Sequence, residues 1–272
     1  MSRKRPSRVR KGKKRDSAVL SWIALAVVVA VAIGVGAFVV RTVMNVPEFD
    51  EATLCPVDGP TSSIVVLLDL TDPVGDTQAL TLSRILDARV DAAPPGTLIS
   101  VGIVSEDPED WGAQFSRCKP ETGENANVIY QNPDMIAERF ESGFREPLRS
   151  ALAGMLEAEE QSQSPIVEAL HRLVEDTLVE TRGSFPSQLI IVSDMIQNSD
   201  RVSFYACQGW DHFRAGGEPL SRNLAGTNIV LAKISRPGAS SCVAEELEPF
   251  WGRYLDEKGA SAPFEIEYLG EL

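Results

Sequence analysis

The stretch IVVLLDLTDP at residues 64–73 decides the fold class. It opens with five consecutive aliphatic residues and changes to polar residues at Asp69. A continuous aliphatic and β-branched run is typical of a strand that is buried on both faces, as in a parallel sheet. A second such run, LIIVSD at residues 189–194, also ends at a carboxylate, Asp194. The sequence therefore predicts two buried strands whose carboxyl ends carry acidic side chains.

Helical and strand patterns alternate around these two runs. The predicted helices cover 77–90, 134–160, 164–179 and 242–258, and the further predicted strands cover 98–104, 127–130, 228–234 and 264–269. The second helix is expected to break near Gly143 or Pro147, and Ser164 is expected to cap the third with Pro165 in its first turn. This alternation predicts an α/β domain over 63–272 with a doubly wound, mostly parallel sheet, in which ligands bind beyond the carboxyl ends of the strands.

The N-terminal region predicts a membrane anchor. Residues 1–16 contain nine Lys or Arg and one acidic residue, and residues 17–40 then contain no charge. These 24 residues would form a helix of roughly 36 Å, enough to cross a hydrocarbon core of about 30 Å, and are longer than the apolar part of a cleaved signal peptide. Because basic residues stay on the cytoplasmic side, we expect a cytoplasmic tail over 1–16, a transmembrane helix over 17–40, a stalk over 41–62 and a periplasmic domain on a bacterial inner membrane.

The part of the chain after Arg41 is strongly acidic. It contains 16 basic and 38 acidic residues, a formal charge of −22, although the whole chain carries only −13. Such a domain repels nucleic acid, so nucleic-acid binding is not expected. The basic tail has a sufficient explanation in topology and anionic lipid.

All four cysteines lie beyond the predicted span, at Cys55, Cys118, Cys207 and Cys242. An even number on the oxidising side of a membrane predicts two disulfides. Chain order favours Cys55–Cys118 and Cys207–Cys242, but the sequence allows three pairings. No CxxC spacing is present, which argues against zinc and thioredoxin-like redox sites.

Oxygen-bearing side chains gather at the predicted edge of the sheet. Asp69 and Thr71 lie in the loop after the first strand, Ser164 opens a helix, and Asp194 follows the later strand. Carboxylate and hydroxyl oxygens suit hard cations such as Mg²⁺. The same four side chains would also serve as ordinary turn and cap residues.

This arrangement resembles the von Willebrand factor type A domain with its metal-ion-dependent adhesion site. That family has an Asp-x-Ser-x-Ser motif after the first strand, a Thr from a second loop and an Asp after the central strand. The resemblance implies that Asp69 is the leading Asp, Thr71 replaces the first Ser, Ser164 replaces the Thr and Asp194 is the last Asp.

The chain departs from the family motif at Pro73, which stands where the second Ser belongs and offers no ligand. The site is therefore expected to be degenerate. Either it binds Mg²⁺, or Mn²⁺ or Ca²⁺, in a changed way that uses Asp72, or it has lost the metal.

Three functions remain open. The resemblance implies a membrane-tethered module that binds an unidentified protein partner and is not an enzyme. A metal-dependent phosphatase-like hydrolase with Asp69 as nucleophile is an alternative, but Thr71 replaces the second Asp of the usual Asp-x-Asp. No Gly-rich phosphate loop follows the first strand and no Gly-x-Ser-x-Gly elbow is present. The third possibility is a structural domain without a ligand.

Overall fold

The fold is described from a computed structural model of the chain. The structure describes residues 15–44, 48–124, 126, 131–156, 161–181, 187–216, 224–234, 240–260 and 265–269. The chain divides into two compact units, residues 1–48 and 49–272.

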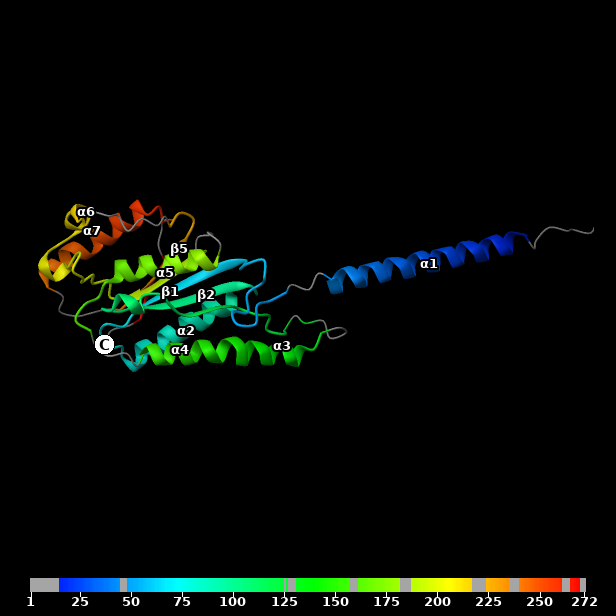
Figure 1. The fold of residues 1–272 in the computed structure, drawn as a ribbon, viewed down its shortest axis with the longest axis horizontal. Coiled ribbons are helices and arrows are strands. Elements are labelled where there is room, and N and C mark those ends of the chain that lie inside the picture. Colours follow the sequence, from blue (N-terminus) through cyan, green and yellow to red (C-terminus); the bar gives the residue numbers. More distant parts are fainter. Residues whose placement is uncertain are drawn as a thin grey trace, which may run out of the picture. The chain divides into compact units, whose positions relative to one another are not determined.

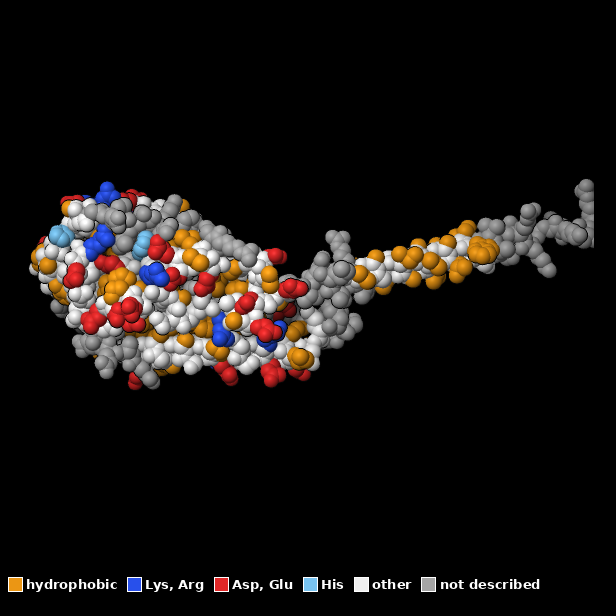
Figure 2. Space-filling view, in the orientation of Figure 1, with side chains coloured by type: hydrophobic (Ala, Val, Ile, Leu, Met, Phe, Trp, Pro, Cys, Tyr) orange, Lys and Arg blue, Asp and Glu red, His pale blue; other side chains and the backbone are white. Residues whose placement is uncertain are grey.

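In the first unit, the described residues 15–44 form one long helix, α1 (Arg15–Met44). Its segment Ser21–Phe38 is long and apolar enough to cross a membrane, and its side chains are exposed. Apolar side chains cover the visible surface of this segment (Figure 2). By length and composition the helix fits a membrane span or a signal sequence.

The second unit is built around a six-stranded sheet in the order β3-β2-β1-β4-β5-β6. The strands are β1 (Ser62–Asp69), β2 (Thr97–Val104), β3 (Ala113–Cys118), β4 (Gln188–Ser193), β5 (Asn228–Lys233) and β6 (Glu265–Tyr268). All neighbours pair in parallel except β2 and β3. The predicted doubly wound, mostly parallel α/β fold is confirmed, and the order is that of a Rossmann sheet with an antiparallel edge.

Two layers of helices cover the sheet. The helices are α2 (Asp76–Ala92), α3 (Pro133–Phe140), α4 (Glu146–Leu156), α5 (Ile166–Glu180), α6 (Trp210–Ala215) and α7 (Ser241–Glu257), with short 3₁₀ turns η1 (Pro108–Asp110) and η3 (Phe204–Ala206). Helices α5, α6 and α7 lie on one face, and α2, α3 and α4 on the other (Figure 1). Strand residues alternate between the two cores, so that Val65 and Leu67 face α5 while Val66 and Leu68 face α2.

The helix predicted over 134–160 is interrupted. A π-helical turn, η2 (Glu141–Arg145), separates α3 from α4, so the interruption includes Gly143 and ends before Pro147. Arg117 of β3 donates a hydrogen bond of 2.6 Å to the carbonyl of Gly143. A π-helical turn contains one more residue per hydrogen-bonded turn than an α-helix. Phe144 lies in this turn, and its side chain is fully buried in the core.

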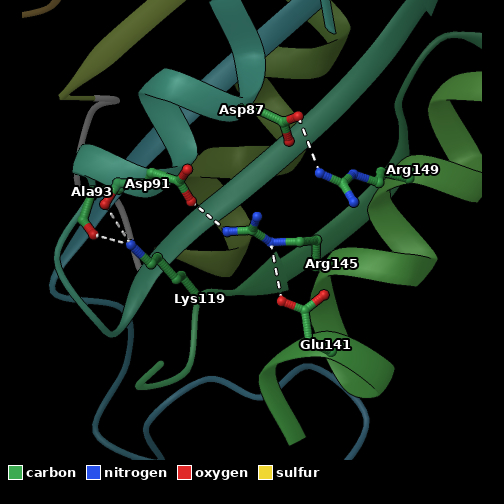
Figure 3. Close-up of polar contacts among 7 residues, drawn as sticks. All are labelled: Asp87, Asp91, Ala93, Lys119, Glu141, Arg145 and Arg149. Atoms are coloured by element: carbon green, nitrogen blue, oxygen red, sulfur yellow. Dashed lines mark hydrogen bonds and ion pairs between the residues drawn. The ribbon is translucent and has the colours of Figure 1, made fainter. Parts of the chain in front are cut away.

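Three basic side chains, two from η2 and α4 and one at the end of β3, bind α2 (Figure 3). The ion pairs join Arg145 to Asp91 and Arg149 to Asp87. Lys119, buried at the end of β3, donates to the carbonyls of Asp91 and Ala93 at 2.8 and 2.7 Å. These carbonyls belong to the C-terminal end of α2, where a positive charge is favourable, so Lys119 acts as a cap.

The segment before β1 differs from the predicted stalk over 41–62. The compact second unit begins at Phe49, because Cys55 is bonded to Cys118 of β3 and the amide of Cys118 donates to the carbonyl of Thr53 at 2.8 Å. The antiparallel strand β3 was not expected, and the strand predicted over 127–130 lies outside the described residues. Helix α5 begins at Ile166 and Pro165 is its N-cap residue, so Ser164 is not the helix cap that the sequence predicted. The Ser164 hydroxyl instead donates a hydrogen bond to Asp69.

Candidate functional site

The candidate site lies at the carboxyl edge of the sheet, where the chain order reverses between β1 and β4. Strand β2 follows β1 toward one edge, whereas β4 leads toward the other. At such a switch point the loops after the two strands diverge and leave room for a ligand. Asp69 ends β1 and Asp194 follows β4 directly.

Asp69 is the centre of the site and accepts hydrogen bonds from three hydroxyl groups. Its Oδ1 accepts from the hydroxyl of Thr71 at 2.7 Å. Its Oδ2 accepts from the hydroxyls of Ser164 at 3.1 Å and of Ser193 at 2.6 Å. All four residues are buried. The structure thus brings together three of the four predicted site residues, Asp69, Thr71 and Ser164, from three separate segments.

Ser193 is the contact that the sequence prediction missed. Leu68 pairs with Val192 in the parallel register, so Asp69 and Ser193 occupy neighbouring positions at the ends of their strands. Side chains two residues apart on a strand point to the same face, so Asp69 lies on the face of Leu67 and Ser193 on the face of Ile191. Leu67 and Ile191 both face α5, and the Asp69 and Ser193 side chains therefore meet on that side of the sheet. Register and alternation together could have identified Ser193.

Asp194 is held by its own turn. Its Oδ1 accepts a hydrogen bond of 2.8 Å from the amide of Ile196. The next residue, Met195, has a left-handed φ of 66°, which is unfavourable for a residue with a side chain. Two bonds hold it there: its amide donates to the Ser193 hydroxyl at 2.7 Å, and its carbonyl accepts from the indole of Trp251 at 2.8 Å. Such enforced backbone conformations concentrate at functional sites.

Ser164 is clamped by backbone contacts as well as by Asp69. Its amide donates to the carbonyl of Asn198 at 2.8 Å, and its carbonyl accepts from the amide of Asn198 at 2.9 Å. In the adjoining loop, the amide of Gln161 donates to the carbonyl of Thr71 at 2.9 Å. Three loops are therefore joined around the Asp69 carboxylate.

Burial raises the pKa of Asp69, and the hydrogen bonds from Ser193, Thr71 and Ser164 oppose this rise without cancelling it. A carboxylate removed from water resists ionisation, whereas hydroxyl donors favour the charged form. A cation beside Asp69 would stabilise the ionised carboxylate, so the site favours the binding of a positive charge.

The raised pKa predicts an unusual pH dependence for Asp69→Asn. A group whose pKa is raised on folding contributes stability that is complete below its ordinary pKa and is lost as pH rises through the folded-state value. The asparagine does not titrate, so the Tm of the variant minus that of the parent chain should increase from about pH 4 to about pH 8. Thermal melts of the full chain in detergent micelles across that range measure it.

Asp211→Asn is the matched control, because the Asp211 side chain is 98% exposed and its loss removes the same charge from the surface. A difference for Asp69→Asn that shrinks as pH rises would show that Asp69 is stabilised as a carboxylate by the protein itself.

The donor set can be tested for its fit to a metal. In the described part of the chain, no group of three or more His, Cys, Asp or Glu side chains is arranged to hold a metal ion. A cation at this edge would therefore rely on two carboxylates, Asp69 and Asp194, together with hydroxyl oxygens and water. Each hydroxyl that donates its proton to Asp69 keeps lone pairs for a metal. This set fits Mg²⁺, which retains several waters, better than a cation that demands a full cage of protein ligands.

The predicted disulfide pairing agrees with the structure. The Cα atoms of Cys55 and Cys118 lie 4.7 Å apart and those of Cys207 and Cys242 lie 4.8 Å apart, within the range of disulfides. The described residues contain no free cysteine. Disulfides persist in oxidising compartments, so the two bonds are a hint of an extracytoplasmic domain.

Comparisons with known proteins add little beyond this geometry. No protein-family model and no curated protein matches the chain. Among solved structures, the chain is similar to the crystal structure of the ArnB paralog VWA2 from Sulfolobus acidocaldarius, with 10% sequence identity and a TM-score of 0.37. The match covers 77% of this chain and 41% of that one, so the chain spans about two fifths of the length of that protein.

Proposed function

We propose that this chain is a membrane-tethered, extracytoplasmic protein-binding module that recognises its partner at the carboxyl edge of the sheet. The observation that carries the proposal is the buried Asp69 carboxylate, which three hydroxyls from separate segments surround at the switch point between β1 and β4. Ligands of doubly wound sheets bind at this place.

Binding explains this arrangement better than catalysis does. The hydroxyls of Thr71, Ser164 and Ser193 all donate to the Asp69 carboxylate, and these bonds hold the hydroxyl oxygens in fixed positions, where they could bind a cation. The loop after β1 has only Gly75 where a phosphate-binding loop would have several glycines. We therefore propose a non-enzymatic role, with the type A resemblance as its model.

A divalent cation, Mg²⁺ by the chemistry of the donors, is part of the proposal. Asp69, Thr71, Ser164 and Asp194 would hold it, and Asp69 would also keep the hydroxyls of Thr71 and Ser164 in place. A bound cation would supply an open coordination position that a carboxylate of the partner protein can fill. The domain itself is strongly acidic, and Figure 2 shows acidic side chains spread over one face. The cation would therefore also offset the repulsion between that partner carboxylate and the domain.

Metal addition to the full chain in detergent micelles tests the site. Mg²⁺ or Mn²⁺ is expected to raise the Tm, because a ligand that binds only the native state stabilises it by about 2.7 kcal/mol at 100 times its Kd. Ser164→Ala should abolish most of this rise. Ser162→Ala is the matched control, since Ser162 is an exposed neighbour that donates to Glu106 and not to Asp69. An equal rise in both variants, or no rise in the parent chain, would reject the metal.

Tethering is supported by the apolar segment Ser21–Phe38 of α1 and by the basic residues before it. We propose that the N-terminus is cytoplasmic and that residues 49–272 lie on the other side of a bacterial inner membrane.

Protease digestion of spheroplasts tests the topology. A tag fused after Leu272 is expected to be removed by protease added outside, whereas a tag before Met1 should be protected until the membrane is permeabilised. The reverse pattern would contradict the topology, and recovery of the domain without residues 1–40 would show that the apolar segment is a cleaved signal.

A further inference from the structure

The two disulfides differ in their access to solvent. Cys118 is completely buried and Cys55 is half-buried, whereas Cys207 is exposed and Cys242 is half-buried. Thiol–disulfide exchange begins with attack of a thiolate on a sulfur atom, and its rate depends on access to that sulfur. Cys207 is the most accessible of the four cysteines, so a soluble dithiol reaches the Cys207–Cys242 bond more easily than the Cys55–Cys118 bond.

The exposed disulfide holds a small lobe, residues 203–216, which contains η3 and α6. Cys242 is the second residue of α7, so the bond fastens this lobe to the start of that helix. Cys207 has a left-handed φ of 52°, a conformation that a residue with a side chain rarely adopts. Apart from the disulfide, its amide is held by a hydrogen bond of 3.2 Å to the carbonyl of Phe204. The bond thus restrains a backbone conformation that is locally unfavourable.

Hydrogen bonds connect the lobe to Ser164, two residues before α5. Gln208, next to Cys207, forms two bonds with Ser203: its side-chain oxygen accepts from the Ser203 amide at 2.9 Å, and its amide donates to the Ser203 carbonyl at 3.1 Å. The Ser203 hydroxyl donates to the side-chain oxygen of Asn198 at 2.7 Å. Asn198 then forms the two backbone bonds with Ser164, at 2.8 and 2.9 Å.

The connection ends at the candidate site. The Ser164 hydroxyl donates to Asp69 at 3.1 Å, the longest of the three hydroxyl bonds to that carboxylate. Ser193 donates from the end of a central strand, and Thr71 lies two residues from Asp69, so neither depends on the lobe. Ser164 is the contact that a movement of the lobe would disturb.

We infer that the Cys207–Cys242 disulfide is a redox latch that positions Ser164 at the Asp69 site. A thiolate of a dithiol reductant attacks the Cys207 sulfur, forms a mixed disulfide and releases Cys242 as a thiolate. The second thiol of the reductant then attacks the reductant's other sulfur, which is bonded to Cys207 in the mixed disulfide, and releases Cys207 as a thiolate. Two electrons and two protons pass to the protein, which gains two thiols, and the reductant becomes a disulfide.

Opening the latch frees Cys207 and the adjoining Gln208 from the start of α7, while Phe204 and Phe213 of the lobe stay buried against Phe250. The contacts of Ser203 with Asn198 and of Asn198 with Ser164 then weaken. This structural effect is independent of any metal. Its consequence for ligand binding rests on the proposed function, because a displaced Ser164 hydroxyl could no longer ligate a cation there.

Stepwise reduction of the full chain in detergent micelles tests the latch. Dithiothreitol is titrated, thiols are alkylated and identified by mass, and hydrogen exchange is measured at the amides of Ser164 and Asn198. Cys207 and Cys242 are expected to be alkylated before the other pair, and exchange at both amides should then accelerate at least tenfold. The amide of Ile190 in β4 reports global unfolding and should not change. Reduction of Cys55–Cys118 first, or unchanged exchange after selective opening, would overturn the inference.

Ser203→Ala provides a second variant in which both disulfides remain. It removes the hydroxyl bond to Asn198 and should reproduce the faster exchange at the amides of Ser164 and Asn198 without reduction. If reduction unfolds the whole domain, this variant alone decides, and unchanged exchange in it refutes the connection. Melts with and without Mg²⁺ separate the two proposals: absence of a Mg²⁺ effect in the oxidised chain rejects the metal, whereas the exchange result judges the latch.

Discussion

Phe250→Ala is expected to lower the free energy of unfolding by about 3–5 kcal/mol, the range for removing a fully buried phenylalanine. Phe250 lies in the middle of α7 with no exposed surface. A domain of this size has a total stability of about 5–15 kcal/mol, so this one substitution would remove a large share of it.

The expected loss is large because Phe250 is the centre of an aromatic cluster. Its ring centroid lies 5.1 Å from that of Phe204, 5.4 Å from those of Phe213 and Trp251, and 5.9 Å from that of Trp210. All four pairs are edge-to-face, a geometry that adds to the energy of burial. The partners come from η3, α6 and α7, so the ring holds the lobe 203–216 against the rest of the domain.

Thermal melts of the full chain in micelles measure the effect, and a fall in Tm of roughly 10 °C is expected. Phe250→Leu is the control, since it retains most of the buried volume and should cost much less. If both variants lose the same stability, the aromatic contacts rather than the volume are decisive. A loss below 1 kcal/mol for Phe250→Ala would mean that the cluster closes over the cavity without cost.

The central strands and their order along the chain were predictable because their signal is local. Residues 64–68 and 189–192 are continuous aliphatic runs, and burial on both faces of a parallel sheet requires such runs. The helical spacing in 77–90 and 242–258 identified α2 and α7 to within two residues at each end.

Strand β3 was not predictable by the same means. Its sequence, AQFSRC at residues 113–118, has one large apolar residue, Phe115, and two polar side chains that become half-buried. An edge strand needs only one covered face, and here the disulfide at Cys118 and the buried Lys119 replace hydrophobic burial. The short helix α6 was also not predicted, because its six residues are too few to show helical periodicity.

The candidate site was half predictable. A carboxylate at the end of each buried strand could be read from the sequence, and a shared sheet edge explains why Asp69 and Ser164 meet. The contribution of Ser193 depends on the register between β1 and β4, which the sequence does not state. The hydrogen bonds that join Asn198 to both Ser164 and Ser203 depend on loop conformations, and composition alone does not determine these.

Replacing Cys55 and Cys118 together by alanine is expected to lower the free energy of unfolding by about 4 kcal/mol. The two residues are 63 positions apart, and in the chain-entropy model a cross-link over a loop of that length restricts the unfolded chain by this amount. The bond also fastens the segment 49–61 to β3. The other contacts of this segment include hydrogen bonds from the Cys118 amide to the Thr53 carbonyl and from the Thr61 amide to the Gly96 carbonyl, and the packing of Leu54 against the core. Denaturant unfolding of the full chain in micelles, followed by tryptophan fluorescence, measures the change.

Thr53→Ala is the matched control for this segment. It removes two exposed bonds of the Thr53 hydroxyl, one to Asp50 and one from the Cys55 amide, but leaves the disulfide intact, and it should cost about 1 kcal/mol. If the double alanine variant loses no more than this control, the segment is held by its own turn and the disulfide is dispensable for the fold. If it loses about 4 kcal/mol, the cross-link over this loop is a major source of the stability of the folded domain, as the chain-entropy model expects.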